Sequence, residues 1–222
     1  MSITGDPEGE PMKTGVALAD VIAGQDAAIS ILAALLSRHT NEESGLEKRH
    51  LHVSLAKSAI AALVNVAQNA LVSGGNARRW GNAHANLVPY QLFRTADRDL
   101  VVAVGNDTQW VATCRALGLD ALASDRTVAT NAGRVAQRDR VVGALADRLS
   151  QRSAETWLGV LSAAGVPCGL VRTVREALEG SQTSQRTGVE SAVGGSIRFP
   201  PPKLDEHGAL VRRYGWAAFA HL

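Results

Sequence analysis

The first long segment with a regular hydrophobic pattern runs from residue 17 to residue 38. Its apolar side chains recur at the spacing that one face of a helix requires. They are Leu18, Val21, Ile22, Ile29, Leu32, Leu35 and Leu36. Alanine and glycine fill many other positions, so we expect this helix to be buried on more than one side. Asp20 lies near its start, where a carboxylate suits the free amides and the helix dipole, and we prefer this interpretation to a catalytic acid.

The next two patterns are a short alternation and a second helical stretch. Residues 51–55 alternate apolar with polar side chains and predict a short strand. Residues 56–72 return to helical spacing and predict one further helix. Gly74 and Gly75 follow directly, as glycine often does just past the end of a helix.

The second half of the chain is built from shorter patterns. Two β-type runs, 90–95 and 100–104, flank the residues Ala-Asp-Arg-Asp and predict an antiparallel hairpin. Asn106 or Asp107 is then expected to cap a helix, an explanation that we prefer to anion binding by the same turn. The other expected elements are a helix ending at Gly118, an amphipathic helix at 135–149, a helix from Ser153 to Gly165, a strand at 166–171 and a helix at 174–178.

The composition of the chain changes after residue 178. Residues 179–196 hold Gly, Ser, Thr and Gln with few large apolar side chains, which is typical of a linker. A brief strand at 197–199, an extended run of three prolines and a helix at 205–214 complete the expected elements. No segment of the sequence repeats another.

Composition and charge exclude several classes of protein. The 222 residues are 45% hydrophobic and 20% charged, which is ordinary for a soluble globular protein. The 23 basic and 21 acidic residues give a net charge of +2, so no broad cationic surface predicts nucleic-acid binding. The sequence shows no cationic leader and no apolar run of about eighteen residues, so we expect no membrane partner and a cytoplasmic location.

The cysteines and histidines form no recognisable functional pattern. Cys114 and Cys168 fit neither a disulfide framework nor a metal-ligand spacing, in agreement with a reducing compartment. Cys114 falls within a helical pattern and Cys168 begins an extended run, so both are interpreted as structural. The six histidines share no helical pair spaced for a metal, and no metal site is predicted. The glycine-rich nucleotide fingerprints and the serine-hydrolase elbow are also absent from the sequence.

Residues 74–90 hold a dense group of functional side chains. Glycine, amide, guanidinium, indole and imidazole groups fall together between a predicted helix and a predicted strand pair. Glycines allow sharp turns and close approach to a ligand, and loops on rigid elements often carry binding groups. One hypothesis is that the polar side chains meet a phosphate or a carboxylate. These side chains are those of Arg78, Arg79, Asn82 and His84. The alternative is an ordinary domain linker with a buried Trp80 and solvated arginines.

Seven short motifs follow one another in a fixed order along the chain. They occupy 15–24, 31–36, 52–55, 79–84, 88–93, 104–110 and 165–169, and include Arg-Trp-Gly-Asn-Ala-His and Val-Pro-Tyr-Gln-Leu-Phe. Together they resemble the family III CoA-transferases, also called the CaiB/BaiF family, and most closely the branch that handles dicarboxylic acyl groups such as succinyl-CoA. The resemblance extends over nearly the whole chain up to Leu178, and the ending from Pro200 resembles the family's C-terminal tail.

The resemblance implies an α/β fold in which the helical part of an incomplete Rossmann-like large domain is followed by a small α/β domain with an antiparallel hairpin. The implied segments are a large-domain remnant of two long helices and a strand at 1–75, a linker and site loop at 76–87, the small domain at 88–178, and a linker and C-terminal tail that returns to the large domain at 179–222. The family's glycine-bearing site loop corresponds to the loop described above. The implied candidates for contact with substrate are Gly74, Gly75, Gly81, Asn82 and His84.

The resemblance also implies an activity. Members of this family move coenzyme A from an acyl-CoA to a carboxylic acid through an aspartyl-CoA thioester, and they need no covalently bound cofactor. Their site loop shields the reactive anhydride from water, and their subunits form interlocked dimers. For this chain, the implied ligands are an acyl-CoA and a small carboxylic acid. The implied assembly is a homodimer or a pairing with a missing N-terminal half.

The sequence departs from the family pattern in several places. The family's nucleophilic aspartate falls upstream of Met1, so we expect this chain alone to be inactive, and its own catalytic residues are unknown. Asp20 aligns with a different acidic position and does not replace the nucleophile. His52 and Lys57 stand where the family often carries acidic residues. Two alternatives stay open: a fragment of an α-methylacyl-CoA racemase or carnitine-type CoA-transferase, or a non-catalytic assembly subunit that pairs with a separate N-terminal half.

Overall fold

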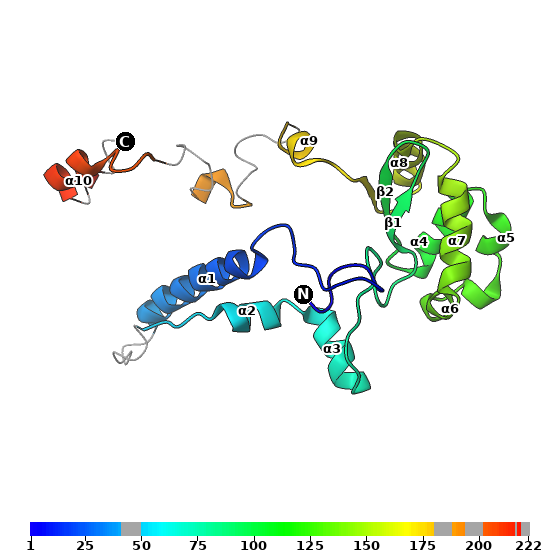
Figure 1. Ribbon diagram of the computed structural model, residues 1–222, viewed down its shortest axis with the longest axis horizontal. Helices are drawn as coiled ribbons and strands as arrows, with labels where there is room; N and C mark the ends of the chain where they lie inside the picture. Colours follow the sequence, from blue (N-terminus) through cyan, green and yellow to red (C-terminus); the bar gives the residue numbers. More distant parts are fainter. Residues whose placement is uncertain (41–49, 180–187, 194–201, 216, 219–222) are drawn as a thin grey trace. The chain divides into compact units, whose positions relative to one another are not determined.

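The computed structural model describes residues 1–40, 50–179, 188–193, 202–215 and 217–218 (Figure 1). The chain divides into two compact units, Met1–Leu170 and Val171–Leu222. The domain boundaries expected from the sequence, after residues 75, 87 and 178, stay predictions.

The second unit contains short helices. They are α9 (Val174–Glu179), η4 (Ser191–Val193) and α10 (Gly208–Tyr214). Thr173 caps α9, because its hydroxyl accepts from the Glu176 N–H at 3.2 Å while the Glu176 carboxylate accepts from the Thr173 N–H at 2.7 Å. The helix expected there is confirmed. The helix expected at 205–214 is present as α10, whereas the strand expected at 197–199 lies outside the described residues.

Two helices near the start of the first unit pack against each other. Helix α1 spans Leu18–Thr40, which confirms the helix predicted from the hydrophobic pattern, and Asp20 lies in its first turn. Helix α2 (Leu55–Ala61) packs against α1. The buried hydroxyl of Ser58 on α2 donates a 2.5 Å hydrogen bond to the carboxylate of Asp26 on α1. This bond joins the two helices at one point along their length.

Two expectations for the segment that follows α1 are wrong. Residues 51–54 form no strand, because the described strands all lie within residues 90–170 and leave this alternating run without a partner. The single helix expected at 56–72 is divided into α2 and α3 (Val64–Ser73), which differ in direction by 74°. Helix α2 packs on α1, whereas α3 is bonded through Asn69 to the loop that follows it. Tertiary contacts therefore divide a pattern that is continuous in the sequence.

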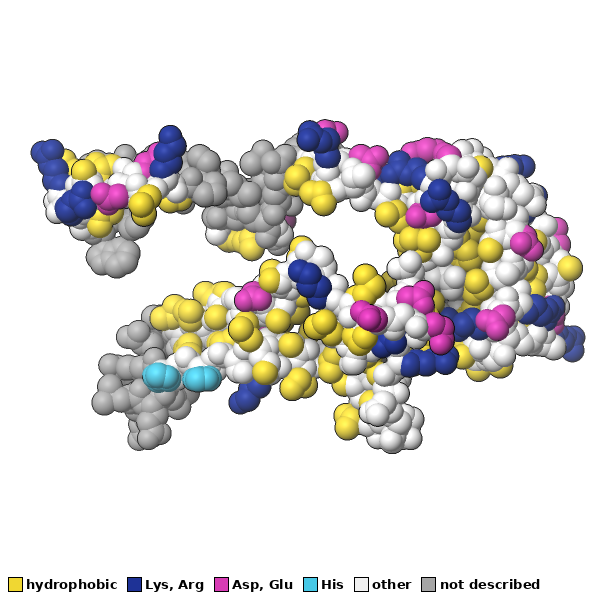
Figure 2. Space-filling model, in the orientation of Figure 1, with side chains coloured by type: hydrophobic (Ala, Val, Ile, Leu, Met, Phe, Trp, Pro, Cys, Tyr) yellow, Lys and Arg dark blue, Asp and Glu magenta, His cyan; other side chains and the backbone are white. Residues whose placement is uncertain are grey.

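Helix α1 exposes much of its apolar surface, although the sequence predicted burial on several sides. The side chains of Ile29, Leu32 and Leu36 are 64%, 65% and 68% exposed, and Figure 2 shows hydrophobic side chains along this helix. By length and composition alone, the 20 residues Leu18–Ser37 could cross a membrane, with a mean hydropathy of 1.6. This corrects the expectation that no apolar run reaches that length. The core helix of a larger soluble protein passes the same test.

The first unit also contains a three-stranded antiparallel sheet in the order β1-β2-β3. Strands β1 (Tyr90–Arg94) and β2 (Asp99–Ala103) form the hairpin predicted from the sequence, with Tyr90 opposite Ala103. Strand β3 (Cys168–Leu170) confirms the strand expected near the end of this unit and pairs with β2.

Several short helices surround the sheet. They are α4 (Asp107–Ala116), α5 (Asp120–Ala123), η2 (Arg126–Val128), α6 (Asn131–Ala136), α7 (Arg138–Leu149) and α8 (Ala154–Ala163). Asn106 caps α4 by accepting from the Gln109 N–H at 2.9 Å, and Ser153 caps α8. The helix expected at 135–149 is only partly correct, because the backbone turns at Gln137 and separates α6 from α7.

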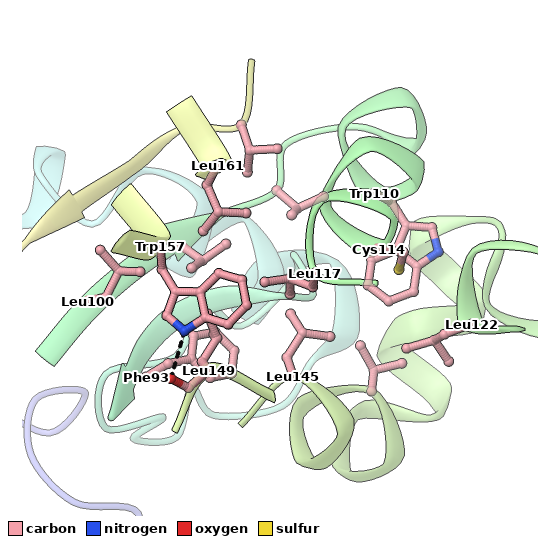
Figure 3. Packing of buried hydrophobic residues seen from close by; sticks show 14 of the residues in the cluster. Phe93, Leu100, Trp110, Cys114, Leu117, Leu122, Leu145, Leu149, Trp157 and Leu161 are labelled. Carbon is pink, nitrogen blue, oxygen red and sulfur yellow. Dashed lines mark hydrogen bonds between the residues drawn. The ribbon is translucent and has the colours of Figure 1, made fainter. Parts of the chain in front are cut away.

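The apolar core lies in residues 88–166. Figure 3 shows its packing, in which the indole of Trp157 also donates a 2.9 Å hydrogen bond to the carbonyl of Leu149. Of the buried apolar side chains in the described residues, only Ala23 and Ala218 lie outside this range. The sheet and its surrounding helices thus have a hydrophobic core of their own, whereas α1 to α3 have almost none.

Both cysteines are free thiols within the structural framework. Cys114 is fully buried, and burial raises the pKa of its thiol to about 12, so the thiol stays protonated and unreactive near neutral pH. Cys168 lies in β3, with its sulfur 3.5 Å from the hydroxyl of Ser162. These positions agree with the structural interpretation of both residues.

Candidate functional site

The loop that follows α3 begins with the two glycines that end the helix. Gly74 adopts a left-handed conformation with φ 68°, and its N–H donates to the carbonyl of Ala70 at 3.0 Å. The N–H of Gly75 donates to the hydroxyl of Ser73 at 3.1 Å. Both glycines therefore serve to stop α3 and turn the chain into the loop.

Arg79 fastens the loop to the start of the chain. Its guanidinium donates to the carbonyls of Asp6 at 2.8 Å and Gly9 at 2.6 Å, with a longer contact of 3.4 Å to that of Pro7. Gly81, with φ 58°, donates from its N–H to another carbonyl of the same N-terminal segment at 3.2 Å. Because backbone carbonyls occupy its guanidinium, Arg79 has a structural role and does not support the hypothesis of anion binding by this side chain.

His84 is held as a neutral imidazole that accepts hydrogen bonds. Its Nδ1 accepts from the N–H groups of Asn86 at 3.0 Å and Leu87 at 3.1 Å, so the ring proton lies on Nε2. The ring stacks on Tyr90 with centroids 5.2 Å apart. Burial, and then the positive charge of Arg138, lower the pKa of His84 below its usual 6.5. His84 therefore shapes the loop as an acceptor and stays uncharged at neutral pH.

This arrangement predicts a pH-dependent contribution of His84 to stability. As pH falls through about 6.5, the unfolded imidazole binds protons more readily than the folded imidazole, because the pKa of His84 is lowered in the folded state. The free energy of unfolding is therefore expected to rise with pH between the lowered pKa and about 6.5. Replacing His84→Asn keeps an acceptor in place of Nδ1 but removes the titration. Urea unfolding at several pH values should show a smaller slope for the variant, and an equal slope in both proteins would contradict the assignment.

Side chains from the helices α6 and α7 hold the second half of the loop. Arg138 donates to the carbonyls of His84 at 3.1 Å and Ala85 at 2.8 Å. The side-chain amide of Asn131 accepts from the Val88 N–H at 3.2 Å and donates to the carbonyl of Asn86 at 2.7 Å. These bonds hold the loop backbone against α6 and α7.

A pair of amides holds the same loop to α3. The amide nitrogen of Asn69 donates to Asn86 at 2.7 Å, and the amide nitrogen of Asn86 donates back to Asn69 at 2.9 Å. The reciprocal pair satisfies one donor and one acceptor on each side chain. The loop is therefore bonded both to the helix before it and to α6 and α7 after it.

Trp80 lies at the middle of the loop between two cationic side chains and a pocket. The guanidinium carbon of Arg78 is 3.9 Å from the indole centroid, and that of Arg138 is 4.5 Å away. The adjacent pocket has a volume of about 790 Å³. Its lining comprises Ile3, Asn65, Val66, Asn69, residues 76–78, Trp80, Gly81, residues 83–86, Ala132, Val135 and Ala136.

The structure brings some of the sequence candidates together and separates others. Gly81 and His84 line the pocket beside Trp80. Gly74 and Gly75 lie at the end of α3 and do not line it, and Asn82 is exposed outside the lining. The roles proposed for these five residues in substrate contact stay predictions.

The polar turn at residues 105–109 caps helix α4, as the sequence predicted. The Gln109 side chain accepts from the Gly105 N–H at 2.8 Å, and the Gln109 N–H donates back to Asn106 at 2.9 Å. Among the residues that the structure describes, no three His, Cys, Asp or Glu side chains are placed to hold a metal ion.

Sequence comparison identifies the family. The pattern of CoA-transferase family III matches residues 1–208 of this chain. The chain therefore belongs to CoA-transferase family III, the CaiB/BaiF family, which confirms the resemblance read from the seven motifs.

Curated relatives and solved structures share about half of their length with this chain. Succinyl-CoA:glutarate CoA-transferase of Mus musculus is 32% identical over 93% of this chain and 51% of the relative. Succinate–glutarate CoA-transferase of Agrobacterium fabrum is 35% identical over 95% of this chain and 56% of the relative. The crystal structure of a CaiB/BaiF family protein from Brucella suis matches this chain with a TM-score of 0.69 and 35% identity. The match covers 96% of this chain and 59% of the Brucella suis chain. The chain thus spans little more than half the length of these proteins.

Proposed function

We propose that this chain is the C-terminal part of a CoA-transferase that moves coenzyme A from an acyl-CoA to a small carboxylic acid. The observation that carries this proposal is the family match over residues 1–208, which includes the loop and the pocket beside it. The names of the mouse and Agrobacterium relatives suggest succinyl-CoA as donor and glutarate as acceptor.

The proposed reaction proceeds through covalent intermediates on an aspartate. The aspartate carboxylate attacks the thioester carbonyl, which forms a mixed anhydride and releases the CoA thiolate. The thiolate then attacks the aspartyl carbonyl, which forms an aspartyl-CoA thioester and releases the first acid. The second acid repeats these two steps in reverse order, so one exchange of thioester for carboxylate is divided into smaller steps. The loop at 76–87 would exclude water from the anhydride.

The proposal places the nucleophile outside this chain, in the other half of the large domain. The exposed apolar surface of α1 and the near absence of a core before residue 75 support such a complement. The proposal further includes assembly as a homodimer, a location in the cytoplasm, and a small domain that extends from residue 88 to residue 178.

In the test below, the extended protein is this chain preceded by the sequence encoded immediately upstream of it.

Peptide mapping of a covalent adduct tests this assignment. The extended protein is mixed with succinyl-CoA without an acceptor acid, digested, and analysed by mass spectrometry for a peptide that carries coenzyme A in thioester linkage. The adduct is expected on an aspartate upstream of Met1. An adduct on Asp20, or on any other carboxylate of these 222 residues, would show that the nucleophile was assigned to the wrong half.

A further inference from the structure

The charge of the pocket beside Trp80 is unbalanced. Among the described residues that line it, Arg78 carries the only charge, since His84 is neutral and the lining contains no Asp or Glu. Four asparagines add amide groups to the wall. Two of these amides pair with each other, and the amides of Asn65 and Asn76 lie outside that pair.

A second guanidinium adds to this positive potential. Arg138 lies over the same indole as Arg78, and burial together with the charge of Arg78 lowers the pKa of its guanidinium. Neither arginine forms an ion pair with a carboxylate in the part of the chain that the structure describes. The Nη1 atom of Arg138 is buried without a hydrogen-bond partner there. The negative charge of Asp139 offsets part of this lowering of the Arg138 pKa. Two neighbouring cations without an ion-paired carboxylate favour an anionic ligand.

The lining of the pocket also favours a ligand with an apolar part. Trp80, Val66 and Val135 supply hydrocarbon surface, and a volume of about 790 Å³ lies in the range of small-molecule sites. A ligand that combines a short aliphatic chain with an oxyanion would cover this surface and place its charge at Arg78. Guanidinium groups bind carboxylate and phosphate oxygens through two parallel hydrogen bonds.

We propose that this pocket binds a small molecule through an oxyanion that pairs with Arg78, with the amides of Asn65 and Asn76 as further donors. A carboxylate and a phosphate group are the two sources of such an oxyanion. The inference deepens the proposed function, on which the choice of glutarate as a probe rests. It makes Arg78 a binding residue for the charged end of the ligand.

Binding to the 222-residue chain tests this site without any CoA transfer. Glutarate, inorganic phosphate and glutaramide, the uncharged diamide of the same length as glutarate, are titrated while NMR follows the indole N–H signal of Trp80. That signal is assigned by its loss in Trp80→Phe. Glutarate or phosphate is expected to shift it, whereas glutaramide is not. Arg78→Gln should weaken binding about tenfold or more, since an interaction with a charged group is lost.

Two further variants separate binding from general effects of charge and folding. Arg78→Lys keeps the charge but loses the fork of donors, so it should retain part of the affinity. Arg115→Gln removes the same charge from an exposed position on α4 and should leave binding unchanged. Circular dichroism checks that each variant is folded, and Arg78→Lys still tests the site if Arg78→Gln is not.

Each outcome decides the inference. Binding of glutarate without phosphate supports a carboxylate, binding of phosphate without glutarate supports a phosphate group, and binding of both supports an oxyanion site of broad preference. Failure of both anions to bind, equal binding of glutaramide, or undiminished binding by Arg78→Gln would overturn it. If the extended protein transfers CoA but the pocket binds no anion, this inference fails and the proposed function stands. If the pocket binds an anion but the extended protein transfers no CoA, the proposed function fails and this inference stands.

Discussion

Replacing Arg134→Met is expected to lower the free energy of unfolding by about 3–5 kcal/mol. Arg134 is fully buried and donates to the carbonyls of Val88 at 2.7 Å, Val128 at 3.2 Å and Ala129 at 3.0 Å. Methionine would fill similar space but leave these carbonyls without this donor, each at a cost of about 1–3 kcal/mol. The partner carboxylate of Asp107, 2.8 Å away, is 57% exposed, so water can solvate it after the change.

Arg140→Met is the matched control for this prediction. Arg140 pairs with Asp125 at 2.6 Å, but its side chain is 52% exposed, and exposed ion pairs contribute only about 0–1 kcal/mol. Urea unfolding followed by circular dichroism and tryptophan fluorescence compares the two variants with the parent chain. Equal losses in the two variants would contradict the assigned role of the buried guanidinium. A third variant, Asp107→Asn, should resemble the control, because the carbonyls and not the carboxylate dominate the effect.

Elements defined by local chemistry could be predicted from the sequence. The hairpin of β1 and β2 follows from two alternating runs joined by a short polar turn. The end of α3 follows from Gly74, whose positive φ suits glycine better than other residues. The start of α8 follows from Ser153, whose hydroxyl accepts from the Thr156 N–H at 3.3 Å. In each case, residues within a few positions of one another determine the structure.

Elements that depend on distant partners could not be predicted in this way. Residues 51–54 alternate like a strand but have no neighbouring strand among the described residues. The apolar spacing of 56–72 continues across the break between α2 and α3, because one helix packs on α1 and the other is bonded to the loop. Alternation and helical spacing indicate which side chains of a segment are apolar and share one face. They do not indicate which distant segment packs against that face.

The candidate site was predictable in its position but not in its construction. Glycines and varied polar groups marked the loop, and the structure brings Gly81 and His84 to a pocket within it. The side chains that hold the loop in shape were missed. Asn69 is bonded to a residue 17 positions away and Arg138 to one 54 positions away, so no local pattern marks either. The carbonyl partners of Arg79 could not be predicted for the same reason, since they lie 70 or more positions earlier.

The distribution of buried side chains connects the fold to the proposed function. The buried apolar core lies in residues 88–166, whereas α1 leaves Ile29, Leu32 and Leu36 exposed. In the proposed protein, the missing part of the large domain covers these side chains and brings its nucleophile to the loop. Catalysis should then require the complete large domain, because the proposed nucleophile belongs to it.

Transfer of CoA from succinyl-CoA to glutarate, measured as glutaryl-CoA by chromatography, tests the central claim most directly. The 222-residue chain alone is expected to form no glutaryl-CoA above the rate in buffer, whereas the extended protein is expected to form it with turnover. Glutaryl-CoA formed by the chain alone and abolished by a substitution within it, such as Asp20→Asn, would contradict the account, as would an extended protein that forms none from any acid supplied.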